Sequence, residues 1–137
     1  MNMIHIMRLY MDDIKTILKN SPMFGELTEE NIKNMAGLFE KRQTCPGEIL
    51  AQAGDTAHSY FLLGKGTILC AIDDGKAVVL TRPGDFMGMQ FLSDDSKYNA
   101  TMTALESGVV YTVLRREFED LCPAGFKHET EVDFCTD

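Results

Sequence analysis

Residues 84–92 read GDFMGMQFL, and a polar loop separates them from the segment YNAT at residues 98–101. A Gly-Asp turn leads into an apolar pair, a second glycine and a short apolar segment, and a new strand is predicted near Ala100. Glycine lets the backbone approach a ligand closely, and consecutive free N–H groups in a short helical turn attract phosphate. The pattern is therefore typical of a segment that wraps a small anionic ligand.

Short apolar runs separated by turn residues lie on both sides of this segment. The predicted strands cover residues 49–51, 60–63, 67–72, 77–81, 100–105 and 109–114. Asp74-Gly75, between two of these strands, is a strong hairpin signal. We expect a type I′ turn there, which needs positive φ at both central residues. Many short, closely spaced strands predict an antiparallel sandwich or barrel.

Helices are predicted on both sides of the strands. Met11–Lys19 repeats apolar residues at helical spacing. Thr28 is a suitable N-cap for a second helix, whose first turn carries Glu29 and Glu30. Arg115–Leu121 is predicted to form a short third helix. The sequence therefore predicts a mainly β fold with flanking helices.

The composition fits one small domain. The chain has 137 residues, of which 45% are hydrophobic. We expect the domain at residues 11–121, with an N-terminal extension at 1–10 and a C-terminal tail at 122–137. The net charge of −8 disfavours non-specific attraction to nucleic acid or anionic membrane, because neutralising phosphate supplies most of that affinity. No apolar run approaches the roughly 20 residues that a membrane helix needs.

The four cysteines form no C-x-x-C pair, and no secretory signal accompanies them. We therefore expect reduced thiols in a cytoplasmic protein. His5, His58 and His128 lie far apart, and no His/Cys spacing resembles a zinc site. Nothing resembles a nucleophile elbow, a paired-carboxylate site or a phosphate loop. The sequence thus predicts neither an enzyme nor a metal centre.

The order of elements, two helices, a β-roll with a short helical insert and a closing helix, resembles the cyclic-nucleotide-binding domain of the Crp/Fnr regulators. The matching segments are Gly47-Glu48-Ile49-Leu50, Ala53-Gly54-Asp55, Tyr60–Leu63 with Gly66, Asp74-Gly75, Pro83-Gly84-Asp85-Phe86 with Gly88, Ala100-Thr101 and Arg116-Glu117-Phe118. The resemblance covers about Ile14 to Leu121. It implies an antiparallel, jelly-roll-like β-roll, in which residues 84–99 form the phosphate-binding cassette.

In that family the cassette binds cyclic nucleotide through backbone amides, an arginine on the phosphate and a carboxylate on the ribose hydroxyl. Met89 stands where the glutamate usually lies, and Tyr98 stands where the arginine usually lies. Arginine offers a charged, bidentate fork that tyrosine does not imitate. Losing two charged partners removes most of the affinity for a micromolar ligand. Cyclic nucleotide is therefore a doubtful ligand, although the resemblance still implies a binding site at Phe86, Gly88, Met89, Gln90, Tyr98, Asn99 and Ala100.

We expect a regulatory module for another small molecule, less charged and more apolar. By the family's mechanism, ligand contacts in the cassette would shift the helix that starts near Arg115. Alternatively, Met89, Phe91 and Tyr98 simply fill the interior of the roll. A ligand-free protein-interaction or dimerisation module also stays open, as does the sensor part of an interrupted Crp/Fnr regulator. Sixteen residues follow Leu121, too few for that family's helix-turn-helix, so direct binding of nucleic acid is not expected.

Overall fold

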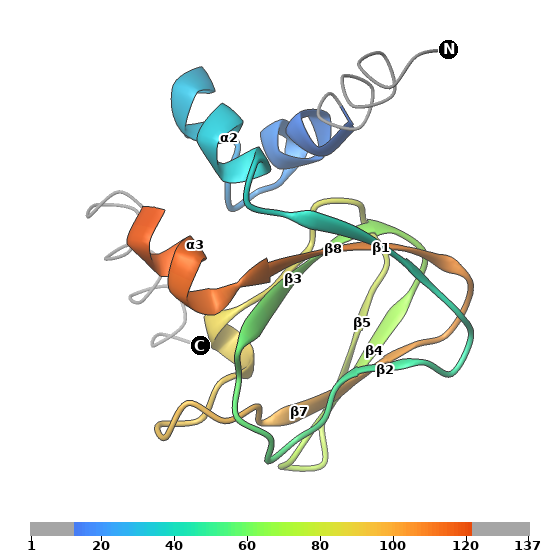
Figure 1. The fold of residues 1–137 in the computed structure, drawn as a ribbon. Helices are drawn as coiled ribbons and strands as arrows, with labels where there is room; N and C mark the ends of the chain where they lie inside the picture. Colours follow the sequence, from blue (N-terminus) through green and yellow to red (C-terminus); the bar gives the residue numbers. More distant parts are fainter. Residues whose placement is uncertain (1–12, 122–137) are drawn as a thin grey trace.

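Two antiparallel sheets and a group of helices make up the computed structural model, which describes residues 13–121 (Figure 1). The first helix covers residues 13–20, and it is followed by α2 (Glu29–Ala36) and, after the strands, by α3 (Arg115–Leu121). The strands are β1 (Glu40–Thr44), β2 (Ile49–Ala51), β3 (Ser59–Lys65), β4 (Ile68–Ile72), β5 (Ala77–Leu80), β6 (Phe86–Met87), β7 (Ala100–Ala104) and β8 (Gly108–Leu114). A short 3₁₀ turn, η1 (Met89–Phe91), lies between β6 and β7.

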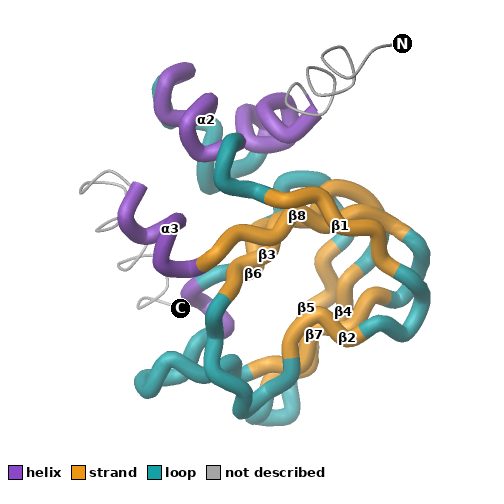
Figure 2. The backbone as a smooth tube through the Cα atoms, in the orientation of Figure 1, coloured by secondary structure: helices purple, strands orange, loops and turns teal. Residues whose placement is uncertain are grey.

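The strands form two four-stranded sheets with the orders β1-β8-β3-β6 and β2-β7-β4-β5. All pairings within them are antiparallel. Figure 2 shows the two sheets as opposite walls of a roll, with the helices gathered beyond the first sheet. The predicted mainly β fold, an antiparallel β-roll with flanking helices, is confirmed.

Both faces of β3 are buried, because alternate side chains of this strand enter two different cores. Tyr60 and Leu62 pack under the helices, in a cluster that includes Ile14, Leu18 and Phe118. Phe61 and Leu63 point the other way, into the interior of the roll. A strand that is covered on both faces needs a continuous apolar run, which explains why the sequence there is apolar without alternation.

Helix α2 begins as predicted at the Thr28 cap. The Thr28 Oγ1 atom accepts a hydrogen bond of 3.1 Å from the backbone N–H of Asn31. This bond satisfies one of the N–H groups that the first turn of a helix leaves without an internal partner. Ile32, Met35 and Ala36 then form the buried face of the helix.

The hairpin at Asp74-Gly75 is present, but the predicted type I′ turn is wrong. Gly75 has a φ of +92°, whereas Ser96 is the one non-glycine residue with positive φ among those described. Asp74 therefore lacks the positive φ that a type I′ turn requires at its first central residue. The bonds from Gly75 N to Ile72 O and from Ile72 N to Lys76 O instead close a three-residue loop, at 3.0 and 2.8 Å.

Strand β1 was not predicted, because its sequence, EKRQT, contains no apolar residue. It is held by a five-residue ladder with β8 rather than by burial of its own side chains. The predicted extension at residues 1–10, the tail at 122–137, and His5, His128, Cys122 and Cys135 lie outside the described residues. Within residues 13–121, no helix combines the length and apolar character needed to cross a membrane.

Gly84 fixes the start of the cassette against the first helical segment. Its carbonyl oxygen accepts a bond of 2.6 Å from the Ser21 hydroxyl, and its φ is +98°. A Cβ atom on Gly84 would lie 3.1 Å from Ser21 Cα and 3.2 Å from Ser21 Cβ. Gly75 has nearly the same φ, but nothing lies within 4 Å of the position that its Cβ would take.

This pair of glycines allows a controlled test. We expect Gly75→Ala to lower the free energy of unfolding by about 1–2 kcal/mol, the cost of an L-residue in this conformation. Gly84→Ala should cost about 1–3 kcal/mol more, because Ser21 must also move. Urea unfolding of both variants measures the difference. Equal losses would show that the contact with Ser21 adds nothing.

Candidate functional site

The cassette starts at β6, whose two residues point to opposite sides of the sheet. Met87 enters the interior of the roll, and Phe86 packs under the helices. The Phe86 ring stacks on that of Phe118 with a centroid distance of 5.1 Å, and it meets Phe24 edge-on at 5.1 Å. Phe86, predicted as a ligand-binding residue, therefore lies in the helix-side core and connects the cassette to α3.

The backbone N–H of Gly88 is satisfied by a side chain of the cassette itself. It donates a bond of 3.0 Å to Gln90 Oε1, and the Gln90 Nε2 atom donates a bond of 2.6 Å to the Phe86 carbonyl oxygen. Gly88 is buried, and a Cβ atom there would collide with the Phe86 ring. Met89 packs, partly buried, against the helix-side cluster. An anion at this turn would have to displace the Gln90 amide from Gly88.

Tyr98 closes one end of the roll, and its side chain is only 8% exposed. Its hydroxyl donates a bond of 2.7 Å to the Ser59 carbonyl oxygen and accepts one of 3.3 Å from the Ser59 N–H. Burial raises the pKa of the Tyr98 hydroxyl, and it outweighs the bond to Ser59 and the positive charge of Arg115, which both lower that pKa. The side chain is therefore neutral, and its one proton is already donated within the chain.

The end of the cassette is also bound to the loop between β2 and β3. Tyr98 N donates to the Asp55 carbonyl oxygen at 2.9 Å, and Gly54 N donates to the Tyr98 carbonyl oxygen at 2.8 Å. Ala57 N donates to the Ser96 carbonyl oxygen at 2.9 Å. This short ladder makes residues 54–59 and the end of the cassette one connected unit.

Asn99 and Ala100 occupy the join between the cassette and β7. The Asn99 N–H donates to the Phe91 carbonyl oxygen at 2.9 Å. Its Oδ1 atom is the one buried side-chain oxygen or nitrogen within residues 13–121 that has no hydrogen-bond partner. Ala100 is fully buried inside the roll. Of the seven predicted site residues, Tyr98 and Ala100 thus belong to the interior cluster, whereas Phe86 and Met89 belong to the core under the helices.

Arg115, at the first position of α3, connects this helix to the β2–β3 loop and to the loop that precedes β7. Its guanidinium donates bonds of 3.2 Å to the Ala57 carbonyl oxygen and 3.1 Å to the Ser96 hydroxyl. The same group forms an ion pair of 3.1 Å with Glu119, one turn further along the helix. Together with the Phe86–Phe118 stack, these bonds connect both ends of the cassette to α3.

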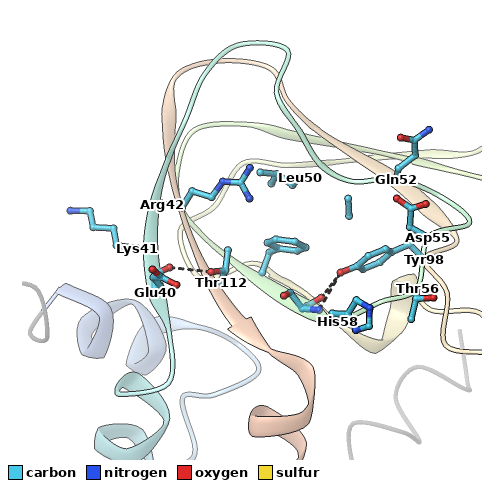
Figure 3. Close-up of a pocket in the computed structure, with 13 residues that line it drawn as sticks. Glu40, Lys41, Arg42, Leu50, Gln52, Asp55, Thr56, His58, Tyr98 and Thr112 are labelled. Carbon is cyan, nitrogen blue, oxygen red and sulfur yellow. Dashed lines mark hydrogen bonds between the residues drawn. The ribbon is translucent and has the colours of Figure 1, made fainter.

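A cavity of about 520 Å³ lies beside Tyr98, between the two sheets, on the side of β1 and β2 (Figure 3). Strand β6, where the cassette starts, is the opposite edge of the first sheet. The lining residues are Glu40, Lys41, Arg42, Leu50, Ala51, Gln52, Asp55, Thr56, His58, Ser59, Phe61, Tyr98 and Thr112. Tyr98 is the single residue shared with the predicted site. In β1, Arg42 lies two residues before Thr44, which is buried, so both face the interior. Because β1 contains no apolar residue, no sequence pattern predicted this arrangement.

The described residues hold no cluster suited to a metal ion. No group of three or more His, Cys, Asp or Glu side chains comes together within residues 13–121. Cys45 is a free, exposed cysteine, and Cys70 is free and buried inside the roll. Burial raises the pKa of the Cys70 thiol to about 12, so this thiol stays protonated and unreactive.

Comparison with known proteins identifies a family that this chain matches. The family described as "Cyclic nucleotide-binding domain" matches residues 41–124, more than half of the chain. An uncharacterised NTE family protein of Mycobacterium tuberculosis is 25% identical over 112 residues, which are 82% of this chain and 19% of that protein. The chain thus spans about a fifth of the length of this relative.

Two solved structures share the fold and differ in their relation to cAMP. The regulatory subunit of a cAMP-independent protein kinase A from Trypanosoma brucei has a TM-score of 0.80 and 17% identity, covering 95% of this chain and 47% of that one. A cAMP-bound chain called PfPKA-R has a TM-score of 0.78 and 19% identity, covering 96% of this chain and 47% of that one. Similarity of fold therefore does not identify the ligand. Because the family model matches residues 41–124, the chain belongs to the family of cyclic nucleotide-binding domains.

Proposed function

We propose that this domain is a regulatory module that senses a small molecule other than cAMP or cGMP. The observation that carries the proposal is the position of Tyr98. The hydroxyl of this residue, which replaces the family's phosphate-binding arginine, is held on both sides by the backbone of Ser59. A neutral hydroxyl with its proton already donated offers a phosphate neither charge nor a hydrogen bond.

Two further groups of the cassette oppose a cyclic phosphate. The Gly88 N–H already donates to Gln90, so a phosphate must break that bond before it can gain one. The buried Asn99 Oδ1 is a hydrogen-bond acceptor, so it offers no hydrogen bond to the acceptor oxygens of a phosphate. Leaving such groups unpaired, or placing acceptors against each other, costs about 1–3 kcal/mol each in a buried site.

The connections to α3 support a regulatory output. Arg115 binds Ala57 and Ser96, which lie on the two loops that meet at Tyr98. A ligand that moves either loop must change these bonds, and it thereby changes the packing of α3 on the roll. In this proposal, α3 packs on the roll in one of two positions, and binding of the ligand changes which of them is populated.

The experiment is a thermal melt of the chain with millimolar cAMP or cGMP, with a cAMP-bound regulatory chain such as PfPKA-R as the positive control. A ligand at 100 times its Kd stabilises the native state by about 2.7 kcal/mol, which raises Tm by several degrees in a domain of this size. We expect a shift below roughly 1 °C for this chain with either nucleotide. A shift of several degrees with either nucleotide would contradict the proposal.

A further inference from the structure

We infer that the cavity beside Tyr98 binds a small zwitterion with its charges at opposite ends, of the size and character of an apolar dipeptide. The inference rests on the proposed function, because it names the ligand class of a sensor that does not take cyclic nucleotides. It concerns the β1–β2 side of the roll rather than the cassette. The volume of about 520 Å³ falls within the usual range of small-molecule sites.

The floor of the cavity is apolar and aromatic. It is formed by Phe61 and Tyr98 together with Leu50 and Ala51 of β2. Figure 3 shows Tyr98 and Leu50 among the lining side chains. Phe61 is held in the interior core, and Tyr98 is fixed by its two bonds to Ser59. The floor is therefore preformed, and it can cover apolar side chains of a ligand without reorganising.

The walls carry opposite charges. Arg42 of β1 and Asp55 of the β2–β3 loop line opposite sides of the cavity; Arg42 points toward its middle, and Asp55 is exposed at its edge (Figure 3). One nitrogen of the Arg42 guanidinium is paired with the Glu48 carboxylate, and an arginine has five N–H donors in all. The ion pairs within residues 13–121 include none for the Asp55 carboxylate. Arg42 can therefore bind a ligand carboxylate and Asp55 a ligand ammonium.

The charge balance of the lining favours a ligand that carries both signs of charge over one with a single sign. Two cations, Lys41 and Arg42, and two carboxylates, Glu40 and Asp55, belong to the lining, although the whole chain carries a net charge of −8. Of the two cations, Arg42 points inward and Lys41 points away from the other lining residues (Figure 3). An anion would leave the Asp55 carboxylate without a partner, and a cation would leave unused the Arg42 donors that Glu48 does not occupy. A zwitterion satisfies both ends, and apolar side chains between its charges complement the aromatic floor.

The test is calorimetric titration of the complete chain with Leu-Leu and two matched probes, N-acetyl-Leu-Leu and Leu-Leu-amide. Each probe lacks one of the two charges and keeps both apolar side chains. We expect Leu-Leu to bind about tenfold more tightly than either probe. Equal binding of all three, preference for one of the singly charged probes, or no binding of Leu-Leu would overturn the inference.

Two variants assign each charge to its partner. Arg42→Gln should weaken Leu-Leu about tenfold and leave Leu-Leu-amide unchanged, whereas Asp55→Asn should weaken Leu-Leu and leave N-acetyl-Leu-Leu unchanged. Arg82→Gln and Asp94→Asn make the same charge changes at residues outside the lining, and they should leave all three affinities unaltered. Equal effects of the control variants would overturn the assignment.

The outcomes for the two proposals are separable. If Leu-Leu does not bind and neither cAMP nor cGMP shifts Tm, the inference of a zwitterionic ligand is wrong and the proposed function stands. If cAMP gives a shift of several degrees, the proposed function is wrong whatever Leu-Leu does.

Discussion

Replacing Phe118 with alanine is expected to lower the free energy of unfolding by about 3–5 kcal/mol, the usual cost of truncating a buried phenylalanine. Phe118 is 4% exposed, and its ring meets those of Phe24, Tyr60 and Phe86 at centroid distances of 6.0, 5.4 and 5.1 Å. The four rings come from the segment before α2, from β3, from β6 and from α3. Their loss should detach α3 and loosen the start of the cassette together.

Urea unfolding measures the loss, and amide hydrogen exchange locates it. Phe118→Leu keeps most of the buried volume, so it should cost only about 1–1.5 kcal/mol. We expect faster exchange in the Phe118→Ala variant at residues 86–91 as well as in α3. A loss as small as that of Phe118→Leu, or faster exchange in α3 alone, would contradict the role of the ring cluster as a connection between helix and cassette.

Much of the fold follows from patterns that are local in the sequence. The apolar run at β3, the Thr28 cap and the Gly75 turn each express a requirement of a few neighbouring residues, and all three are present. Strand β1 escapes prediction because its stability comes from pairing with β8, some 70 residues away. The prediction of a type I′ turn at Asp74 was wrong because an Asp-Gly pair occurs in both two-residue and three-residue hairpin loops.

The site could be predicted only in part, for a physical reason of the same kind. The sequence places Tyr98 and Met89 at the critical cassette positions, but the direction of each side chain depends on distant partners. Tyr98 finds Ser59, which lies 39 residues away, and Met89 turns to the core under the helices. The cavity draws its lining from four strands and two loops, so no single segment could reveal it.

These contacts also explain how a cassette can keep its shape without a phosphate. Gln90 takes the N–H of Gly88, Tyr98 binds Ser59, and Arg115 binds Ser96. Each of these bonds joins groups of the chain itself, so the described conformation of the cassette requires no phosphate. The regulatory question is then which molecule changes these bonds, and the cavity beside Tyr98 is in direct contact with one of them.

Replacing Tyr98 with arginine is expected to raise the affinity for cAMP by about 30- to 150-fold, the value of roughly 2–3 kcal/mol that one charged, bidentate phosphate contact provides. The new guanidinium would lie near the charges of both Arg115 and Asp55, which already act on Tyr98, so Asp55 offers it a partner while Arg115 repels it. Loss of the two Ser59 bonds should lower the free energy of unfolding by about 1–2 kcal/mol. Calorimetric titration with cAMP measures the gain in affinity, and a thermal melt measures the loss in stability.

Further variants distinguish the effect of the added charge on cAMP affinity from the effect of removing the tyrosine hydroxyl. Tyr98→Phe removes the two hydrogen bonds to Ser59 without adding charge. It should therefore lose part of the stability that Tyr98→Arg loses and gain no affinity for cAMP. Met89→Glu alone should gain less than about tenfold, because this side chain faces the helix-side core and not the roll, and a carboxylate there is costly to bury. If Tyr98→Arg folds and still ignores cAMP, the missing arginine is not what excludes the nucleotide. The Gln90 amide on Gly88 and the filled interior would then be the cause, and Gln90→Ala in the arginine background is the variant in which binding should appear.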